Sequence, residues 1–164
     1  MDRSAAPAQV RGALDSNGPD QTREIGRALG EASFPGTVLA LVGELGAGKT
    51  QLAKGVAEGL GVEGVVNSPT FVLMNEHPGR LRLFHADAYR LGEPEEAMAA
   101  GLLDDREMDG VFVIEWADRL DGWLPIERLH VTILPGEGPD ERRIAWVAHG
   151  GRHEALARRA LVAR

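Results

Sequence analysis

The sequence of 164 residues contains no cysteine, so it can form neither a disulfide framework nor a thiolate metal site. No apolar run approaches the roughly 20 residues of a membrane-spanning helix, and the N-terminal segment lacks the basic-then-apolar layout of a signal peptide. These absences favour a cytoplasmic protein with no membrane partner. The net charge of −7 argues against unaided binding of nucleic acid, which needs a basic surface, although a partner protein could hold the nucleic acid.

Lysine is scarce as well, because only Lys49 and Lys54 among the 18 basic residues are lysines. Lys49 belongs to a segment that matches the phosphate-binding P-loop pattern G-x-x-x-x-G-K-[ST]. The segment reads Gly43, Glu44, Leu45, Gly46, Ala47, Gly48, Lys49, Thr50. An apolar run precedes it and an amphipathic run follows it, which is the strand, loop and helix order that a P-loop requires.

Each residue type in this segment has a chemical reason to be there. Its glycines allow the backbone N–H groups to turn toward an anion, and the following helix directs its N-terminal amides to the same place. Lys49 is expected to reach the β- and γ-phosphates of a nucleotide, and the Thr50 hydroxyl is expected to ligate Mg²⁺. The segment therefore predicts a nucleotide site.

The length suits a single domain with a core of its own. Residues 1–19 have no periodicity and predict a flexible tail with at most a weak strand around Gln9 to Leu14, so residues 20–164 are expected to form one P-loop domain. Its first helix is expected to begin with Asp20 as N-cap. The predicted class is α/β: a three-layer P-loop NTPase with a mixed, partly parallel central sheet and an antiparallel hairpin.

The order of the expected elements follows from apolar periodicity and turn residues. They are a strand at Val38–Val42, a helix at Gln51–Leu60, a hairpin of Phe71–Glu76 with Arg80–Asp87, a central parallel strand at Val111–Trp116, two strands at Leu129–Leu134 and Ile144–Ala148, and a closing helix at Ala155–Val162.

Acidic residues stand at the ends of two predicted strands. Glu115 ends the central parallel strand, where P-loop enzymes place an acid that binds Mg²⁺ or orients a water, and a solvated strand end is the alternative. His85 and Asp87 share one face of the hairpin's second strand, because side chains alternate along a strand. A metal or phosphate role and a structural role remain equally open for these two residues.

Hydroxyl groups supply further candidates. Ser68 and Thr70 flank a proline in a stiff segment, where P-loop proteins keep a loop that senses the γ-phosphate, although a simple proline turn explains the spacing equally well. Thr22 lies in the first turn of the first helix, where a capping or solvated hydroxyl is the ordinary role.

Four motifs together resemble the TsaE (YjeE) family, the small ATPases of bacterial threonylcarbamoyladenosine synthesis on tRNA. They are the P-loop at 43–50, Ser68-Pro69-Thr70-Phe71, His85-Ala86-Asp87-Ala88-Tyr89-Arg90 and Ile114-Glu115-Trp116. The similarity extends from about Thr22 to Ile144. Two positions depart from the family pattern: His77 stands where tyrosine is common, and Ala88 replaces the usual leucine.

The resemblance implies a cytoplasmic ATPase with Mg²⁺, slow on its own, that acts as a nucleotide switch with the partners TsaB and TsaD and meets tRNA only through that complex. It implies Thr50 and Glu115 as Mg²⁺ ligands, with Asp87 close to the metal and Lys49, Glu115 and Asp87 as catalytic residues. Residues 44–50 and Thr22 would bind ATP, with Thr22 near the adenine. The switch-like residues would be Ser68, Thr70, His85 and Trp116.

Two other functions stay open at this level. A small-molecule kinase would need an arginine-bearing lid, for which the short loop Glu137 to Arg143 is the candidate. A binding module could use the nucleotide state with incidental hydrolysis. A GTPase is disfavoured because the sequence has no Asn-Lys-x-Asp motif.

Overall fold

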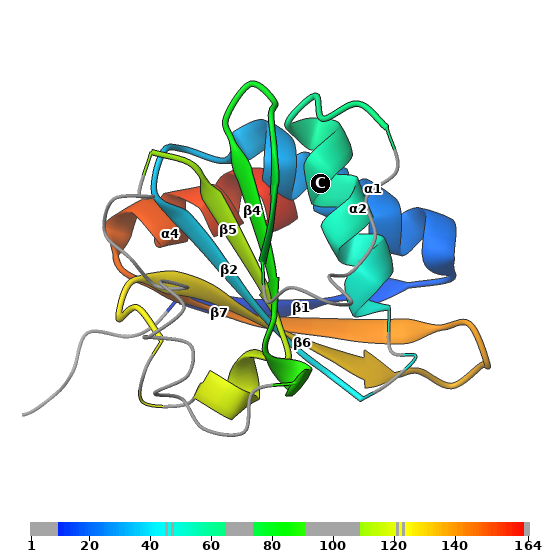
Figure 1. The fold of residues 1–164 in the computed structure, drawn as a ribbon. Coiled ribbons are helices and arrows are strands. Elements are labelled where there is room, and N and C mark those ends of the chain that lie inside the picture. Colours follow the sequence, from blue (N-terminus) through cyan, green and yellow to red (C-terminus); the bar gives the residue numbers. More distant parts are fainter. Residues whose placement is uncertain are drawn as a thin grey trace, which may run out of the picture.

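The computed structural model describes residues 10–44, 46, 48–64, 74–90, 109–120, 122 and 124–162 (Figure 1). In chain order the elements are β1 (Val10–Ser16), α1 (Pro19–Ala32), β2 (Thr37–Val42), α2 (Lys49–Gly59), β3 (Met74–His77), β4 (Leu83–Asp87), the 3₁₀ turn η1 (Ala88–Arg90), β5 (Val111–Glu115), the 3₁₀ turn η3 (Ala117–Leu120), β6 (Arg128–Pro135), β7 (Arg142–His149), α4 (Gly151–Ala157) and the π-helical turn η4 (Arg158–Val162). None of the helices in these ranges combines the length and apolar character needed to cross a membrane.

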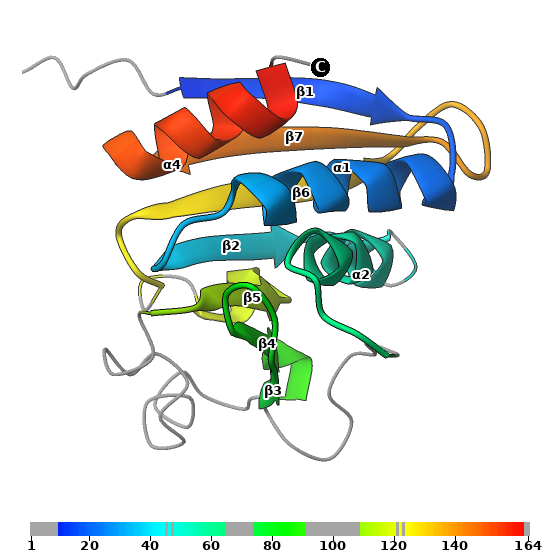
Figure 2. The ribbon, with the colours of Figure 1, turned by 90° about the horizontal axis from the view of Figure 1, so that it is seen from above.

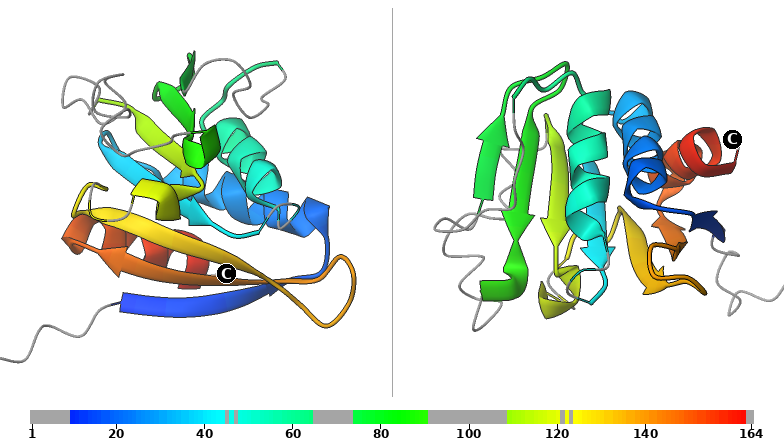
Figure 3. Two further views of the ribbon diagram at one scale, coloured as in Figure 1. Left: turned by 60° about the horizontal axis from the view of Figure 1, so that its bottom comes forward. Right: turned by 90° about the vertical axis from the view of Figure 1, so that its right-hand side faces the viewer.

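Seven strands form one sheet in the order β1-β7-β6-β2-β5-β4-β3. The four central strands β6, β2, β5 and β4 run parallel, and the pairs β1–β7, β7–β6 and β3–β4 are antiparallel. Figure 3 shows β3 and β4 near one edge of the molecule and β1 at the opposite edge. The predicted α/β class, the mixed and partly parallel sheet, and the antiparallel hairpin are confirmed.

The helices α1, α2 and α4 pack on one face of the sheet, where the main core lies (Figure 2). Ile25 of α1, Leu52 of α2 and Leu156 of α4 are buried there against strand residues such as Leu39 and Leu129. A second, smaller core on the other face joins β2, β4 and β5 to the η3 turn. Both faces of β2 and β5 are thus covered, which explains why these strands are continuous apolar runs.

The first strand corrects the domain boundary predicted at residue 19. β1 pairs with β7 from Val10 opposite Ala148 to Ser16 opposite Arg142, so residues 10–16 belong to the sheet. This pairing joins backbone groups that are far apart in the sequence, and a local pattern cannot reveal it. The weak strand expected around Gln9 to Leu14 overlaps β1. Residues 1–9 lie outside the described residues.

The start of α1 also differs from the sequence prediction. The N-cap position is occupied by Gly18, which makes no side-chain capping bond, and the helix begins at Pro19. Asp20 therefore lies in the first turn and is not the N-cap, although its charge still suits the positive end of the helix dipole.

Helices α1 and α2 approach each other through paired glycines. A Cβ atom added to Gly26 would lie 2.2 Å from the carbonyl oxygen of Leu52, and one added to Gly55 would lie 2.0 Å from the carbonyl oxygen of Arg23. Gly30 and Gly59 are equally close to the opposite backbone. The distance between the helices is therefore set by the absence of side chains at these four positions.

Replacing Gly55 with alanine is expected to destabilise the fold by about 1–3 kcal/mol, because the added methyl group forces two helix backbones apart. Urea unfolding measures the effect as a lower midpoint at constant slope. Gly151→Ala is the matched control, since nothing lies within 4 Å of a Cβ at that helical position. Equal midpoints for the two variants would contradict this account of the helix contact.

His153 of α4 is buried and accepts a hydrogen bond at Nε2 from the backbone N–H of Val38, 3.0 Å away. This contact requires the neutral imidazole with its hydrogen on Nδ1, and Nδ1 has no hydrogen-bond partner in the described part of the chain. Burial, aided by Arg152 and His149, lowers the pKa of His153 from 6.5 to about 4. The folded protein therefore holds this histidine neutral.

The free energy of unfolding is expected to decrease as the pH is lowered from about 6.5 to 4, because His153 binds a proton in the unfolded chain but not in the folded one. Above the unfolded pKa this contribution is constant. The full loss from this group is at most roughly 3 kcal/mol. Urea unfolding at a series of pH values, compared with His153→Gln, measures it. An unchanged pH slope in the glutamine variant would show that other groups cause the loss.

Candidate nucleotide-binding site

The P-loop lies at the carboxyl ends of the parallel strands, between the end of β2 and the start of α2. Gly46 and Gly48 have positive φ angles of 81° and 110°, a left-handed conformation that side chains other than glycine rarely adopt. α2 begins at Lys49 directly after Gly48. The predicted strand, loop and helix order is therefore present, while Leu45 and Ala47 lie outside the described residues.

Lys49 is held inside this loop with only 5% of its surface exposed. Its Nζ donates hydrogen bonds to the carbonyl oxygens of Gly43 and Glu44, the latter at 2.9 Å. The same atom lies 3.9 Å from the centre of the Trp116 ring. Burial lowers the pKa of Lys49, against the opposing effect of nearby carboxylates, of which Glu115 is the strongest.

Glu115 lies at the end of β5, next to Leu41 of β2 and Asp87 of β4 in the parallel register. It is 3% exposed, so the alternative of a solvated strand end is wrong. Its Oε2 lies 2.5 Å from Nε2 of His85, and its Oε1 accepts a hydrogen bond of 3.3 Å from the Thr50 hydroxyl. A buried carboxylate needs such partners, and these contacts join β4, β5 and α2 at one point.

The same two strand ends carry His85 and Asp87. His85 is fully buried, and its second ring nitrogen, Nδ1, has no hydrogen-bond partner among the described residues. Asp87 is half-buried, and its Oδ1 accepts a hydrogen bond of 2.8 Å from the backbone N–H of Tyr89. The structure thus brings His85, Asp87 and Glu115 together with the P-loop residue Thr50.

The donor atoms at this point suit a hard divalent cation. The Thr50 hydroxyl and the carboxylates of Glu115 and Asp87 are oxygen donors of the kind that Mg²⁺ prefers. The described ranges hold no group of three or more His, Cys, Asp or Glu side chains arranged around a metal. In nucleotide sites Mg²⁺ is usually bound by one or two protein groups, with phosphate oxygens and water as its other ligands.

Thr22 faces the P-loop from the first turn of α1. It is buried, and its hydroxyl lies 2.7 Å from the Ser16 hydroxyl at the end of β1. Its methyl carbon would be 3.8 Å from a Cβ placed on Gly48. The capping alternative does not apply, because Gly18 holds the N-cap position. The fold places Thr22 beside the phosphate loop.

Comparison with known proteins places the chain in one family. A family model described as "Threonylcarbamoyl adenosine biosynthesis protein TsaE" matches residues 16–144. The chain belongs to the TsaE family. The tRNA threonylcarbamoyladenosine biosynthesis protein TsaE of Bacillus subtilis is 43% identical over 139 residues, covering 84% of this chain and 86% of the relative. Its counterpart from Streptomyces coelicolor is 41% identical over 140 residues, covering 82% of this chain and 95% of the relative.

A solved structure supports the same assignment. The crystal structure of Bacillus subtilis YdiB superposes with a TM-score of 0.77 and 36% sequence identity, covering 94% of this chain and 97% of the other. The resemblance to the TsaE family and the P-loop NTPase fold are therefore confirmed. The predicted switch residues Ser68 and Thr70 lie outside the described residues of this TsaE-family chain.

Arg142 contacts the P-loop, and the sequence pattern does not predict this contact. Its Nη2 donates a hydrogen bond of 3.3 Å to the carbonyl oxygen of Gly46, and its Nη1 donates to the carbonyl oxygens of Pro139 and Glu141. The arginine thus ties the turn between β6 and β7 to the phosphate loop. Arg142 falls within the loop considered as a kinase lid, but no local pattern indicates a partner 96 residues away.

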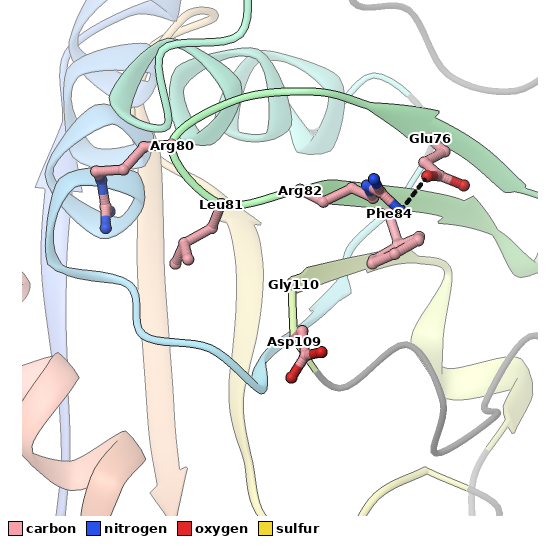
Figure 4. A pocket seen from close by; sticks show the side chains of 7 residues that line it. All are labelled: Glu76, Arg80, Leu81, Arg82, Phe84, Asp109 and Gly110. Carbon is pink, nitrogen blue, oxygen red and sulfur yellow. Dashed lines mark ion pairs between the residues drawn. The ribbon is translucent and has the colours of Figure 1, made fainter.

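A separate cavity of about 380 Å³ lies at the opposite ends of β4 and β5, away from the P-loop of this TsaE-family chain (Figure 4). Its lining residues are Glu76, Arg80, Leu81, Arg82, Phe84, Asp109 and Gly110. Arg82 pairs with Glu76 at 2.9 Å, and Arg80 donates to the carbonyl oxygen of Gly30 at the end of α1. Both arginines are thus engaged by groups of the protein itself.

Proposed function

We propose that this TsaE-family chain is a Mg²⁺-dependent ATPase required for forming the threonylcarbamoyl group on adenosine in tRNA, and that it acts as a nucleotide switch on the TsaB–TsaD complex. The observation that carries the ATPase proposal is the contact of Glu115 with His85 and with Thr50, the residue that directly follows the P-loop lysine. The tRNA role is supported by the names of the relatives and of the family model.

Nucleotide binding would use the P-loop and the start of α2. The backbone N–H groups of the loop and of the first helical turn bind phosphate oxygens, and Lys49 adds a fixed positive charge for the β- and γ-phosphates. Thr50 and Glu115 would hold Mg²⁺, with Asp87 close by. When bound, Mg²⁺ neutralises charge that develops on the phosphates. Thr22 would lie near the adenine, a role supported by its position beside Gly48 of the loop.

The acids at the strand ends would orient the attacking water. Glu115 is buried and fixed by two contacts, so its carboxylate is preorganised for this role, while half-buried Asp87 has one oxygen on the N–H of Tyr89. A group that is already in position does not have to reorganise as charge develops. His85 contributes by holding the Glu115 carboxylate in place.

Hydrolysis by the isolated protein is expected to be slow. An arginine that stabilises the transferring phosphoryl group raises turnover by about 10³–10⁵ in related enzymes. Arg142, the arginine that reaches the P-loop in the described ranges, donates to three backbone carbonyl oxygens instead. We infer that the partner complex supplies the missing acceleration.

Reconstitution tests this function. ATP turnover would be measured for the protein alone and with TsaB and TsaD, and modified tRNA would be counted over many turnovers with and without the protein. The proposal predicts slow hydrolysis alone, faster hydrolysis in the complex, and sustained modification only when the protein is present. Equal turnover with and without partners would contradict the switch. Phosphorylated product from nucleoside or sugar acceptors would favour a kinase.

A further inference from the structure

Four side chains form a continuous stack that connects the P-loop to the surface, which we call the lysine–aromatic column. The Lys49 ammonium lies 3.9 Å from the centre of the Trp116 ring, and that ring lies 4.8 Å from the ring of Tyr89. The guanidinium carbon of Arg119 lies 4.9 Å from the centre of the Tyr89 ring. Both outer members are cations and both inner members are aromatic, so each contact is favourable.

Trp116 occupies an unusual backbone position in this column. Its φ angle of 58° is left-handed, and it is the only residue other than glycine with a positive φ in the described ranges. Such a conformation persists only where the surroundings enforce it, and it concentrates at functional sites. The residue sits between Glu115, the last residue of β5, and the η3 turn. The left-handed turn thus redirects the chain immediately after the site carboxylate.

Each residue of the column comes from a different segment of the chain. Lys49 begins α2, Trp116 follows β5, Tyr89 lies in η1 after β4, and Arg119 lies in η3. The backbone is secured as well, because the N–H of Tyr89 donates to Asp87 and the N–H of Arg119 donates to the carbonyl oxygen of Trp116. Tyr89 and Arg119 are exposed at the outer end, while Lys49 is buried at the inner end.

The geometry around Lys49 shows what the indole ring does there. Two of the three ammonium N–H groups are accounted for by the carbonyl oxygens of Gly43 and Glu44. The Trp116 ring lies over the same ammonium at cation–π distance. The two carbonyl oxygens and the ring surround the ammonium, so a phosphate oxygen that accepts a hydrogen bond from Lys49 would have to displace one of them. A cation–π contact is weaker than a charge-assisted hydrogen bond, so the ring is the partner that we expect phosphate to displace.

We propose that Trp116, Tyr89 and Arg119 are positioning residues of the nucleotide site: the column holds the Lys49 ammonium in the nucleotide-free protein, and phosphate binding displaces the indole from it. This inference rests on the proposed ATP site. Tyr89 packs against the Trp116 ring and Arg119 packs against the Tyr89 ring, so these two residues hold the indole over the lysine.

The proposal predicts tighter nucleotide binding when the column is broken. Replacing Trp116 with leucine removes a contact present only in the free state, and the dissociation constant for ADP should fall by about 3- to 30-fold, the range of a partly buried cation–π contact. Tyr89→Leu should act in the same direction with a smaller effect. Tyr89→Phe keeps the stacking ring and should bind ADP with the affinity of the native protein.

The experiment measures dissociation constants by calorimetry with Mg²⁺ and either ADP or a non-hydrolysable ATP analogue. Arg152→Met is a matched control, because Arg152 makes a similar cation–π contact, 4.2 Å from Phe34, outside the column. Its affinity should equal that of the native protein. Tryptophan emission adds a second readout: nucleotide should change it in the native protein and in Tyr89→Phe but not in Trp116→Phe.

Weaker or unchanged binding in both leucine variants would overturn the proposal, since the indole would then support bound nucleotide or play no part. Where Trp116→Leu does not fold, the exposed Tyr89→Leu decides the question. Failure of the ATP site itself has a different signature: Lys49→Ala would then bind nucleotide as well as the native protein. If Lys49→Ala loses nucleotide binding and the leucine variants show no increase in affinity, the proposed role of the column is wrong and the ATP site still stands.

Discussion

Lys49→Ala is expected to weaken ATP binding by about 10- to 150-fold, because it removes a charge-assisted contact worth about 1.5–3 kcal/mol and the main positive charge of the phosphate loop. The buried position of Lys49 strengthens the effect, since water cannot fully replace the ammonium among the loop carbonyls. Calorimetry with Mg²⁺ and a non-hydrolysable ATP analogue measures the loss.

The other lysine of the chain provides the control. Lys54 follows five residues later in the same helix and outside the P-loop segment, and Lys54→Ala removes the same charge and the same side chain. We expect near-native affinity from this variant. Similar losses from both substitutions would mean that net charge, and not the position of Lys49, determines nucleotide affinity.

Glu115→Gln is expected to lower ATP hydrolysis about 100-fold or more while nucleotide binding is largely retained. The amide keeps the size of the side chain and can still meet the Thr50 hydroxyl and the His85 ring, so the fold of the site should survive. What it loses is the negative charge that would bind Mg²⁺ and orient water. Single-turnover hydrolysis, compared with binding on the same samples, separates the two effects.

Asp87→Asn serves as the comparison for Glu115→Gln, because the two acids are neighbours in the register of β4 and β5. A larger loss of hydrolysis in the asparagine variant would show that Asp87, and not Glu115, orients the attacking water. The tRNA assay adds a second outcome. If Glu115→Gln hydrolyses no ATP and still supports sustained tRNA modification, the protein is a nucleotide-dependent binding module.

Local patterns account for the parts of the fold that were predicted. The apolar run before the P-loop, the glycines within it and the amphipathic run after it lie next to one another in sequence, and they became β2, the loop and α2. The hairpin of β3 and β4 follows from the turn between its strands for the same reason. The sequence predicts a tail in place of β1, because its partner, β7, is distant in the chain and a polar edge strand has only a weak pattern.

By itself, the sequence determined that a P-loop lysine and a strand-end acid exist, because both depend on residue type and local order. Only the tertiary structure decided which groups meet. The register of β4, β5 and β2 brings Glu115 to His85 and Thr50, and the left-handed turn at Trp116 places an indole over Lys49. These contacts join residues far apart in the chain, so they arise from sheet register and packing, which no short stretch of sequence encodes.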